Sequence, residues 1–384
     1  MEENMHKRKV LFVIESLHSD KAAKTLSTVV EYIDKSKYDV TVCSINRGGP
    51  FESKIRENVK YKYLIRGSVD STKSKWIYRK LPMSWVYRLY IPKGYDVEIA
   101  CGEGFVTKLM SCSTNKKAKK YAWVHTDLNK NHWTTEVYKN PEDEVKAYNT
   151  YDGIICATNL LKEAFKAQFP DVVKPVRMIY SPLDSLSVRL KSLNATKEDP
   201  NKVAVRLVTQ GRLEADNAYG RLLKVVYKLN NEGYDVGLWI FGDGLEMGIL
   251  EHYIKDKGME NKVKLFGAHP NPYRYIVHGQ LYVCCSYSSA AVKALILGMP
   301  IVATKTPENN ELFKNGECAL MVSNSENGLY DGIKQFLDNP QLLDEYRTKS
   351  EMRGYEFDIE ALMAPIESLI TNGVSPEEPQ IRNL

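Results

Sequence analysis

Short apolar runs rich in β-branched residues alternate with longer segments of helical periodicity along nearly the whole chain. The runs expected as strands are 10–14, 38–43, 97–101, 121–124, 153–156 and 176–179, and then 206–209, 236–241, 263–266, 281–284 and 301–304. Segments with helical spacing include 22–33, 220–231, 331–337 and 359–371. Strands that alternate with helices predict β–α–β units with parallel strands and right-handed crossovers. The sequence therefore predicts an α/β protein.

The alternation is interrupted once, by a polar stretch that ends near residue 202. A chain of 384 residues is also too long for one ordinary hydrophobic core. We therefore predict two successive Rossmann-like domains, at 1–185 and 203–354, joined by a linker at 186–202. Residues 355–384 are expected to form a C-terminal helix that packs back on the N-terminal domain, followed by a tail.

The composition is that of an average soluble protein, with 43% hydrophobic and 26% charged residues. The first apolar run, 10–14, is too short for a signal peptide, and no run approaches the length of a membrane span. We therefore expect a cytoplasmic protein. The seven cysteines are scattered and include no Cys-x-x-Cys pair, so that neither a zinc site nor a disulfide framework is indicated. Buried thiols are expected instead.

Two loops of the second half carry residues suited to phosphate binding. Gly242-Asp243-Gly244 follows an expected strand and precedes a helix, where glycine lets the backbone approach a phosphate. Taken alone, this motif could equally be a plain turn. Arg212 follows another expected strand and would place a guanidinium at the same edge of the sheet.

The order of the motifs resembles family 4 glycosyltransferases, with the bacterial polysaccharide and capsule enzymes most similar. The motifs are Gly-Glu-Gly at 102–104, Trp-Val-His-Thr-Asp at 123–127, Gly-Arg-Leu at 211–213, Gly-Asp-Gly at 242–244, Asn-Pro-Tyr at 271–273 and Leu-Gly-Met-Pro at 297–300. The resemblance implies a GT-B fold, with two Rossmann-like domains facing each other across a central cleft. It also implies transfer of a sugar from a nucleotide-sugar donor to a lipid-linked or polysaccharide acceptor. Such enzymes are mostly retaining and use neither a metal nor a cofactor.

The resemblance also assigns roles to individual residues. It makes His125 and Glu103 the catalytic pair, with His125 beside the transferred sugar and Glu103 on the acceptor side. From its sequence context alone, His125 is more simply a satisfied histidine of a cleft or core. The residues implied to bind the donor are Arg212, Gly242, Asp243, Gly244, His269, Pro270 and Glu311.

Several positions depart from the family pattern. The loop after the first strand contains Ser19 and Asp20 but no glycine, and Asn217 stands where a lysine would pair with the donor diphosphate. Ala218 replaces the following glycine, and Lys293 replaces a glutamate that binds the ribose hydroxyls. An ammonium donates hydrogen bonds but cannot accept them from a hydroxyl. The alternative hypothesis is therefore a catalytically impaired GT-B protein with a binding or accessory role.

A basic and aromatic segment of the N-terminal half predicts attachment to an anionic membrane surface. Its membrane-facing residues are expected to be Lys73, Lys75, Trp76, Arg79, Lys80, Trp85 and Arg88. Residues 1–185 also hold 31 of the 53 Lys and Arg residues but only 22 of the 48 Asp and Glu residues. Lysine and arginine interleaved with tryptophan suit the interface of an anionic bilayer, so we expect a peripheral protein at the inner face of the membrane. The alternative is a solvated helix whose aromatic side chains pack inward. No nucleic-acid partner is expected.

Overall fold

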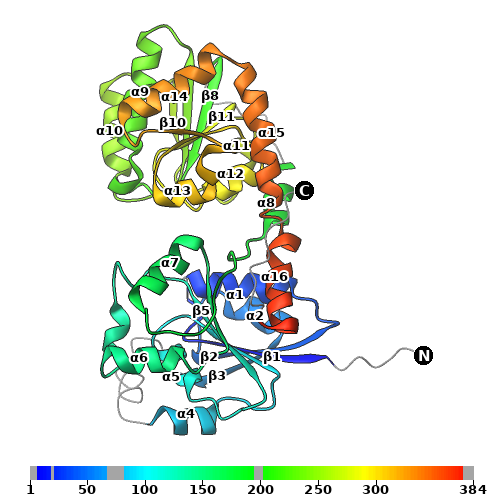
Figure 1. The fold of residues 1–384 in the computed structure, drawn as a ribbon. Helices are drawn as coiled ribbons and strands as arrows, with labels where there is room; N and C mark the ends of the chain where they lie inside the picture. The colour runs from blue at the N-terminus through cyan, green and yellow to red at the C-terminus, as the bar shows by residue number, and fades with distance from the viewer. Residues whose placement is uncertain (1–6, 19–20, 67–81, 194–201, 375–384) are drawn as a thin grey trace, which may run out of the picture. The chain divides into compact units, whose positions relative to one another are not determined.

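The computed structural model describes residues 7–18, 21–66, 82–193 and 202–374, which fold as two compact units. Unit 1 contains the residues up to Leu183 together with those from Leu362 onward, and unit 2 is Asp184–Ala361. Each unit is a parallel sheet flanked by helices, as Figure 1 shows for each separately. Two parallel Rossmann-like units confirm the predicted α/β fold class.

In the described part of unit 1, seven parallel strands form one sheet in the order β3-β2-β1-β4-β5-β6-β7. The strands are β1 (Arg8–Ile14), β2 (Tyr38–Asn46), β3 (Lys60–Ile65), β4 (Val97–Cys101), β5 (Lys119–Val124), β6 (Gly153–Cys156) and β7 (Val176–Met178). The helices are α1 (Lys21–Tyr32), α2 (Glu52–Asn58), α4 (Met83–Tyr90), α5 (Phe105–Ser111), α6 (Pro141–Tyr148) and α7 (Asn159–Gln168). A short 3₁₀ helix, η1 (Trp133–Glu136), follows β5.

The sheet of unit 2 has the order β10-β9-β8-β11-β12-β13. Its strands are β8 (Val205–Gln210), β9 (Val236–Phe241), β10 (Val263–Leu265), β11 (Leu281–Cys284), β12 (Ile301–Thr304) and β13 (Leu320–Val322). Its helices are α8 (Ser185–Leu193), α9 (Tyr219–Asn231), α10 (Met247–Asp256), α11 (Tyr273–Ile276), α12 (Ala291–Ile296), α13 (Pro307–Leu312), α14 (Glu326–Asp338) and α15 (Gln341–Tyr355). The 3₁₀ helices η2 (Ala215–Asn217) and η3 (Lys314–Gly316) follow β8 and α13.

Both sheets reverse their strand order at one point, between β1 and β4 in unit 1 and between β8 and β11 in unit 2. The central strands are buried on both faces, and the residues of β9 are all buried. This burial explains their continuous apolar sequences, because helices cover both faces of a parallel sheet. Ligands of such sheets bind outside the carboxyl ends of the strands at the reversal. The site should therefore be sought at these two points.

Two strands, β3 and β13, were not predicted from the sequence, and both lie at sheet edges. β3 alternates lysine with tyrosine over its first four residues, and among the described residues a partner strand lies on one side of it only. Charged side chains are common on edge strands because they discourage pairing with other chains. β13 has only three residues, all half-buried. Neither strand contains the long apolar run that identifies an interior strand.

The range predicted as a linker, 186–202, is not all irregular, because α8 occupies Ser185–Leu193. Within unit 2, α8 packs against α11 and α12, and the Ser185 Oγ accepts a hydrogen bond from the Ile359 N–H at 2.9 Å. Only Ser185 and Val188 of this helix are buried. Its apolar face is thus weak, which explains why the pattern did not predict a helix. Residues 194–201 lie outside the described residues.

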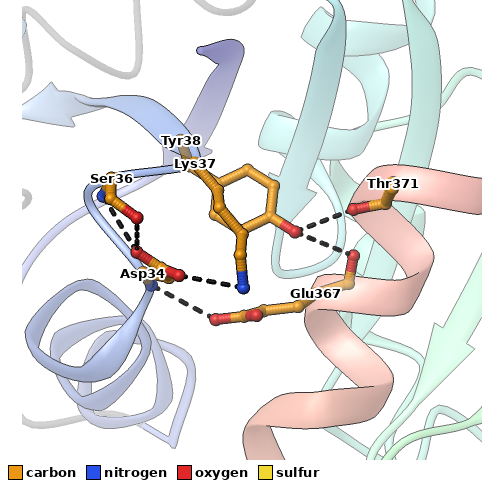
Figure 2. A network of polar contacts seen from close by, with 6 residues as sticks. All are labelled: Asp34, Ser36, Lys37, Tyr38, Glu367 and Thr371. Atoms are coloured by element: carbon orange, nitrogen blue, oxygen red, sulfur yellow. Dashed lines mark hydrogen bonds and ion pairs between the residues drawn. The ribbon is translucent and has the colours of Figure 1, made fainter. Parts of the chain in front are cut away.

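The last helix, α16 (Ile359–Asn372), is attached to unit 1 by hydrogen bonds to the start of β2, as Figure 2 shows. The Tyr38 hydroxyl lies 2.7 Å from Thr371 Oγ1 and donates to the Glu367 carbonyl oxygen at 3.3 Å. The Asp34 N–H donates to Glu367 Oε1 at 3.2 Å. Arg8 Nη1 adds a bond of 2.6 Å to the Thr371 carbonyl oxygen. Side chains and backbone of unit 1 thus fix the final turns of α16.

Candidate functional site

Glu103 links the loops that follow β4 and β5 at the carboxyl edge of unit 1. Its Oε1 accepts hydrogen bonds from the backbone N–H groups of His125 and Thr126, the second at 2.8 Å. The side chain is buried, and this burial raises the pKa of Glu103 above its usual value, although the two backbone hydrogen bonds act in the opposite direction. Glu103 therefore sets the path of the loop that carries His125.

The glycines beside Glu103 are required by the backbone. Gly102 and Gly104 have φ angles of 116° and 68°, in the region that favours glycine. A Cβ atom on Gly104 would also lie 2.7 Å from the Trp133 ring. The Gly-Glu-Gly turn thus lets η1 pack directly against the backbone that presents Glu103.

His125 is buried, with 5% of its surface exposed, and its ring stacks on Trp123 at a centroid distance of 5.5 Å. Neither ring nitrogen has a hydrogen-bond partner among the described residues. Burial, and to a smaller extent the charge of Lys21, lowers the pKa of His125 to about 3. The imidazole is therefore neutral at physiological pH, and its two buried nitrogens lack the partners that a satisfied core histidine has.

Sequence analysis missed His132, which holds the segment between β5 and α6. Its Nε2 lies 2.9 Å from Oε2 of the buried Glu144, and its Nδ1 lies 3.0 Å from Gln168 Nε2. The three residues come from separate elements, so no local pattern in the sequence could have connected them.

Arg212 begins the loop after β8, next to the strand reversal of unit 2. Its side chain is 80% exposed, and an ion pair of 3.4 Å joins it to Glu214. Asn217 Nδ2 donates to the Arg212 carbonyl oxygen at 2.6 Å. Asn217 therefore supports the backbone of Arg212 and supplies no positive charge beside its guanidinium.

The Gly-Asp-Gly turn supports the Arg212 loop instead of presenting free N–H groups. The Gly242 N–H donates to the Gly267 carbonyl oxygen at 2.8 Å, and the Gly244 N–H donates to Asp243 Oδ1 at 2.8 Å. The Asp243 carbonyl oxygen accepts from the Leu213 N–H at 2.9 Å. The expected contact of the Gly242 and Gly244 amides with a diphosphate stays a prediction. The glycines are needed because this turn lies directly against the turn at 211–213.

The other positions of unit 2 that the resemblance implies lie in the loop after β10 and on the helices after β11 and β12. His269 Nδ1 accepts from the Asn271 N–H at 3.1 Å, and its ring packs edge-on against Tyr275 at 5.1 Å. Pro270 is exposed beside it. Lys293 and Glu311 are half-buried on α12 and α13, the helices that follow β11 and β12. Ser19 and Asp20 lie outside the described residues.

Ala218 has a left-handed backbone, with φ 57° and ψ 30°. The resemblance places a glycine here, and the structure retains the glycine-type conformation with an alanine. Left-handed geometry costs an L-residue about 1–2 kcal/mol. The alanine therefore introduces local strain immediately before α9.

The described residues include neither a metal-binding group of side chains nor a helix that could cross a membrane. Residues 7–18, 21–66, 82–193 and 202–374 contain no group of three or more His, Cys, Asp or Glu side chains placed to hold a metal ion. Over the same ranges, no helix combines the length and the apolar character needed to cross a bilayer. None of the seven cysteines forms a disulfide bond, and all except the half-buried Cys112 are buried, as expected.

Unit 2, with Arg212 at its strand reversal, is similar to known sugar-transferring enzymes. Residues 194–353 match the family model described as glycosyl transferases group 1. Over 191 residues the chain is 27% identical to a Campylobacter jejuni enzyme, the N-acetylgalactosamine-N,N'-diacetylbacillosaminyl-diphospho-undecaprenol 4-alpha-N-acetylgalactosaminyltransferase. That match covers 48% of this chain and 50% of the relative, and the chain spans about half the length or less of the first curated relatives.

Solved structures extend the similarity over nearly the whole chain. The Anabaena protein HepE, solved in complex with UDP, has a TM-score of 0.71 at 16% identity and covers 95% of this chain and 100% of its own. A glycosyltransferase from Rickettsia africae has a TM-score of 0.71 at 13% identity, and the match covers 97% of this chain and 100% of that protein. At these identities the likeness shows the fold, which is the GT-B type with two Rossmann-like domains.

We expect Gly242→Ala to destabilise unit 2, because the new Cβ would lie 2.9 Å from the Gly211 carbonyl carbon and the residue has φ 136°. Overpacking of this kind typically lowers the free energy of unfolding by about 1–3 kcal/mol, and the backbone strain lowers it further. Chemical unfolding of both proteins measures the loss. Gly248→Ala is the matched control, because nothing lies within 4 Å of its added Cβ and alanine favours the helix. Equal effects of the two substitutions would contradict the packing described here.

The buried His125 should make unit 1 less stable as the pH falls. In the unfolded chain a histidine binds its proton near pH 6.5, whereas folded His125 stays neutral until about pH 3. The unfolded state therefore binds more protons throughout this window, and stability is lost as the pH decreases from 6.5 towards 3. The loss should approach about 1.4 kcal/mol per pH unit in the middle of the window.

The measurement compares unfolding of the unmodified chain and His125→Gln by tryptophan fluorescence, since four of the five tryptophans belong to unit 1. The difference in unfolding free energy should be constant above about pH 7.5 and should change by about 1.4 kcal/mol per unit between pH 6 and 4. The contribution of Glu103 is common to both proteins and cancels. A difference that stays constant down to pH 4 would show that His125 is not held neutral.

Proposed function

We propose that this chain is a glycosyltransferase that moves a sugar from a nucleotide-sugar donor to a lipid-linked or glycan acceptor. The observation that carries the proposal is the exposed guanidinium of Arg212 at the strand reversal of unit 2, within the segment that matches the family model. A cation at this point of a Rossmann-like sheet suits the diphosphate of a nucleotide.

Arg212 is assigned the donor diphosphate. Its backbone is fixed by Asn217 and by the Gly-Asp-Gly turn, so that little backbone freedom remains to be lost when a ligand binds. A planar guanidinium can form two parallel hydrogen bonds to phosphate oxygens. The same contact would stabilise the negative charge that develops on the leaving diphosphate, without a metal ion.

His125 and Glu103 take different roles in unit 1. The neutral imidazole of His125, with both nitrogens unengaged among the described residues, suits a hydrogen bond to a hydroxyl of the transferred sugar. Glu103 is buried and already accepts two backbone N–H groups, so we assign it the positioning of His125 and not direct contact with the sugar. Retention of configuration is the expectation that the family resemblance supports.

The relatives favour this class of substrate. The name of the Campylobacter jejuni enzyme gives an undecaprenol-linked acceptor, and HepE was solved with UDP. We therefore propose a uridine nucleotide as the first donor to test and a polyprenol-diphosphate glycan as the first acceptor. The departures at Asn217 and Lys293 are the basis of the alternative, an impaired protein that binds but does not transfer.

Calorimetric titration with UDP tests the assignment of Arg212. A charge-assisted hydrogen bond contributes about 1.5–3 kcal/mol, so Arg212→Gln should weaken binding roughly ten- to over a hundredfold. Asn217→Lys should strengthen it, because a second cation would face the diphosphate. Arg347→Gln on α15 removes the same charge from an exposed position of unit 2 and should leave the affinity unchanged.

The unmodified chain should also release UDP from a UDP-sugar when a polyprenol-diphosphate glycan is present. Binding of UDP without such turnover would favour the impaired alternative. No binding of any nucleoside diphosphate at millimolar concentration would overturn the assignment of the donor site.

We also propose that unit 1 attaches to an anionic membrane surface. On α4, Trp85, Leu89 and Tyr90 are 65%, 71% and 56% exposed, and Arg88 is exposed among them. An exposed set of apolar residues with a cation suits the bilayer interface and argues against inward packing of Trp85. Met83, Val86 and Tyr87 are buried and hold the helix on unit 1. The expected residues Lys73, Lys75, Trp76, Arg79 and Lys80 lie outside the described residues.

Replacing Trp85 and Leu89 with serine should lower binding to vesicles containing phosphatidylglycerol by at least about tenfold, because each buried side chain contributes roughly 1.5–3 kcal/mol. Co-sedimentation at low and high salt separates the two contributions to vesicle binding, because salt screens the electrostatic contribution and leaves the apolar one. Val173→Ser with Leu245→Ser is the control, since these exposed apolar residues are not on α4. An equal loss of vesicle binding in both variants would show that α4 is not the membrane-contacting helix.

A further inference from the structure

A hollow of about 880 Å³ lies at the amino ends of β1, β2 and β3 in unit 1. The start of each strand and the end of α2 contribute to its wall. Glu103 and His125 follow the carboxyl ends of β4 and β5, so they belong to the opposite edge of the same sheet. The proposed transfer reaction uses no residue of this hollow.

The side chains that line the hollow are predominantly basic. They include five cations and two carboxylates: Lys7, Lys9, Lys35, Arg56 and Lys60 against Asp39 and Glu57. A concave surface lined by one sign of charge concentrates ligands of the opposite sign. The volume is within the range of about 300–1,000 Å³ that is usual for small-molecule sites.

Three of the cations, Lys7, Lys9 and Lys35, have no carboxylate partner for their side chains among the described residues. Lys60 is neutralised by Asp39, with Nζ 2.9 Å from both carboxylate oxygens, and Arg56 is paired with Glu52 at 3.2 Å. The ammonium groups of Lys7 and Lys35 instead donate to uncharged acceptors of the chain.

Those uncharged acceptors fix the ammonium groups of Lys7 and Lys35 at the wall of the hollow. Lys7 Nζ donates to the Lys35 carbonyl oxygen at 2.8 Å, and Lys35 Nζ donates to Asn58 Oδ1 at 2.6 Å. Each ammonium has three N–H donors, so two remain on each lysine for a ligand. Neither bond neutralises the charge of the ammonium group, so both charges remain to attract an anion.

Protection of a sheet edge does not explain these lysines. Lys60 lies on β3, which is an edge strand where charge discourages pairing. Lys9 lies on β1, between β2 and β4 in the interior of the sheet, and Lys7 directly precedes that strand. Their position at the hollow therefore calls for a different explanation.

We propose that this hollow binds a ligand that carries at least two phosphate groups. Ammonium groups bind phosphate as point charges, and three of them in one hollow exceed what a single monoanion requires. Tyr38 also lines the hollow, and Figure 2 shows its hydroxyl at the attachment of α16. A ligand bound here would contact the residue that anchors the C-terminal helix. The phosphates could come from a soluble oligophosphate or from lipid headgroups, and the test separates these sources.

The first probe is sodium tripolyphosphate, titrated by calorimetry into the Arg212→Gln protein so that the proposed donor site does not contribute. We expect one saturable site and at least a tenfold loss of affinity when Lys7, Lys9 and Lys35 are all replaced with glutamine. The control replaces Lys116, Lys117 and Lys139, which are exposed on unit 1 and do not line the hollow, with the same change of charge. This control should keep the unmodified affinity.

The second probe is vesicles of phosphatidylglycerol, compared with neutral phosphatidylcholine, in the Trp85→Ser/Leu89→Ser background so that α4 does not contribute. Vesicle binding that is lost only in the Lys7/Lys9/Lys35 variant, without tripolyphosphate binding, would identify lipid phosphate as the source. Circular dichroism establishes that both triple variants are folded. Equal losses in the two triple variants, or no binding of either probe, would overturn the proposal.

Discussion

Parallel pairing of strands is the constraint on which the rest of this structure depends. Because parallel strands run in the same direction, all their carboxyl ends lie at the same edge of the sheet, and each strand needs a crossover before its neighbour begins. In unit 1 this rule brings the loops after β4 and β5 together, and Glu103 joins them through two backbone N–H groups. In unit 2 it brings the loops after β8, β9 and β10 together, and the Gly-Asp-Gly turn packs against the turn of Arg212. Residues far apart in the sequence thus become neighbours through topology.

The sequence was sufficient for the fold class and for the interior strands. Runs such as 236–241 are apolar throughout because both faces of the sheet are covered, and this pattern cannot be mistaken for a surface segment. The edge strand β3 and the helix α8 were missed because neither buries a continuous apolar face. Their positions are fixed by neighbours that a single sequence does not reveal, such as β2 for the strand and α11 for the helix.

The candidate site was predictable in part, and the reason differs from residue to residue. Arg212 follows a recognisable strand, so its place at the sheet edge followed from the pattern. The engagement of the Gly242 and Gly244 N–H groups did not, because it depends on hydrogen bonds to Gly267 and to the neighbouring aspartate side chain. The same holds for His132, whose partners Glu144 and Gln168 lie on the helices α6 and α7. Sequence identifies which residue types are present, whereas their hydrogen-bond partners are a property of the folded chain.

The attachment of α16 has a consequence for the order in which the protein is made. Residues up to 183 leave the ribosome first, yet the Tyr38 hydroxyl and the Asp34 N–H are completed by Glu367 and Thr371, near the end of the chain. At about 5–20 residues per second, these partners follow roughly 10–40 s later. During synthesis the start of β2 must therefore remain without its final covering while the whole of unit 2 is translated. The nascent N-terminal unit is thus a protein with an unfilled helix position until the residues from Leu362 onward have been translated.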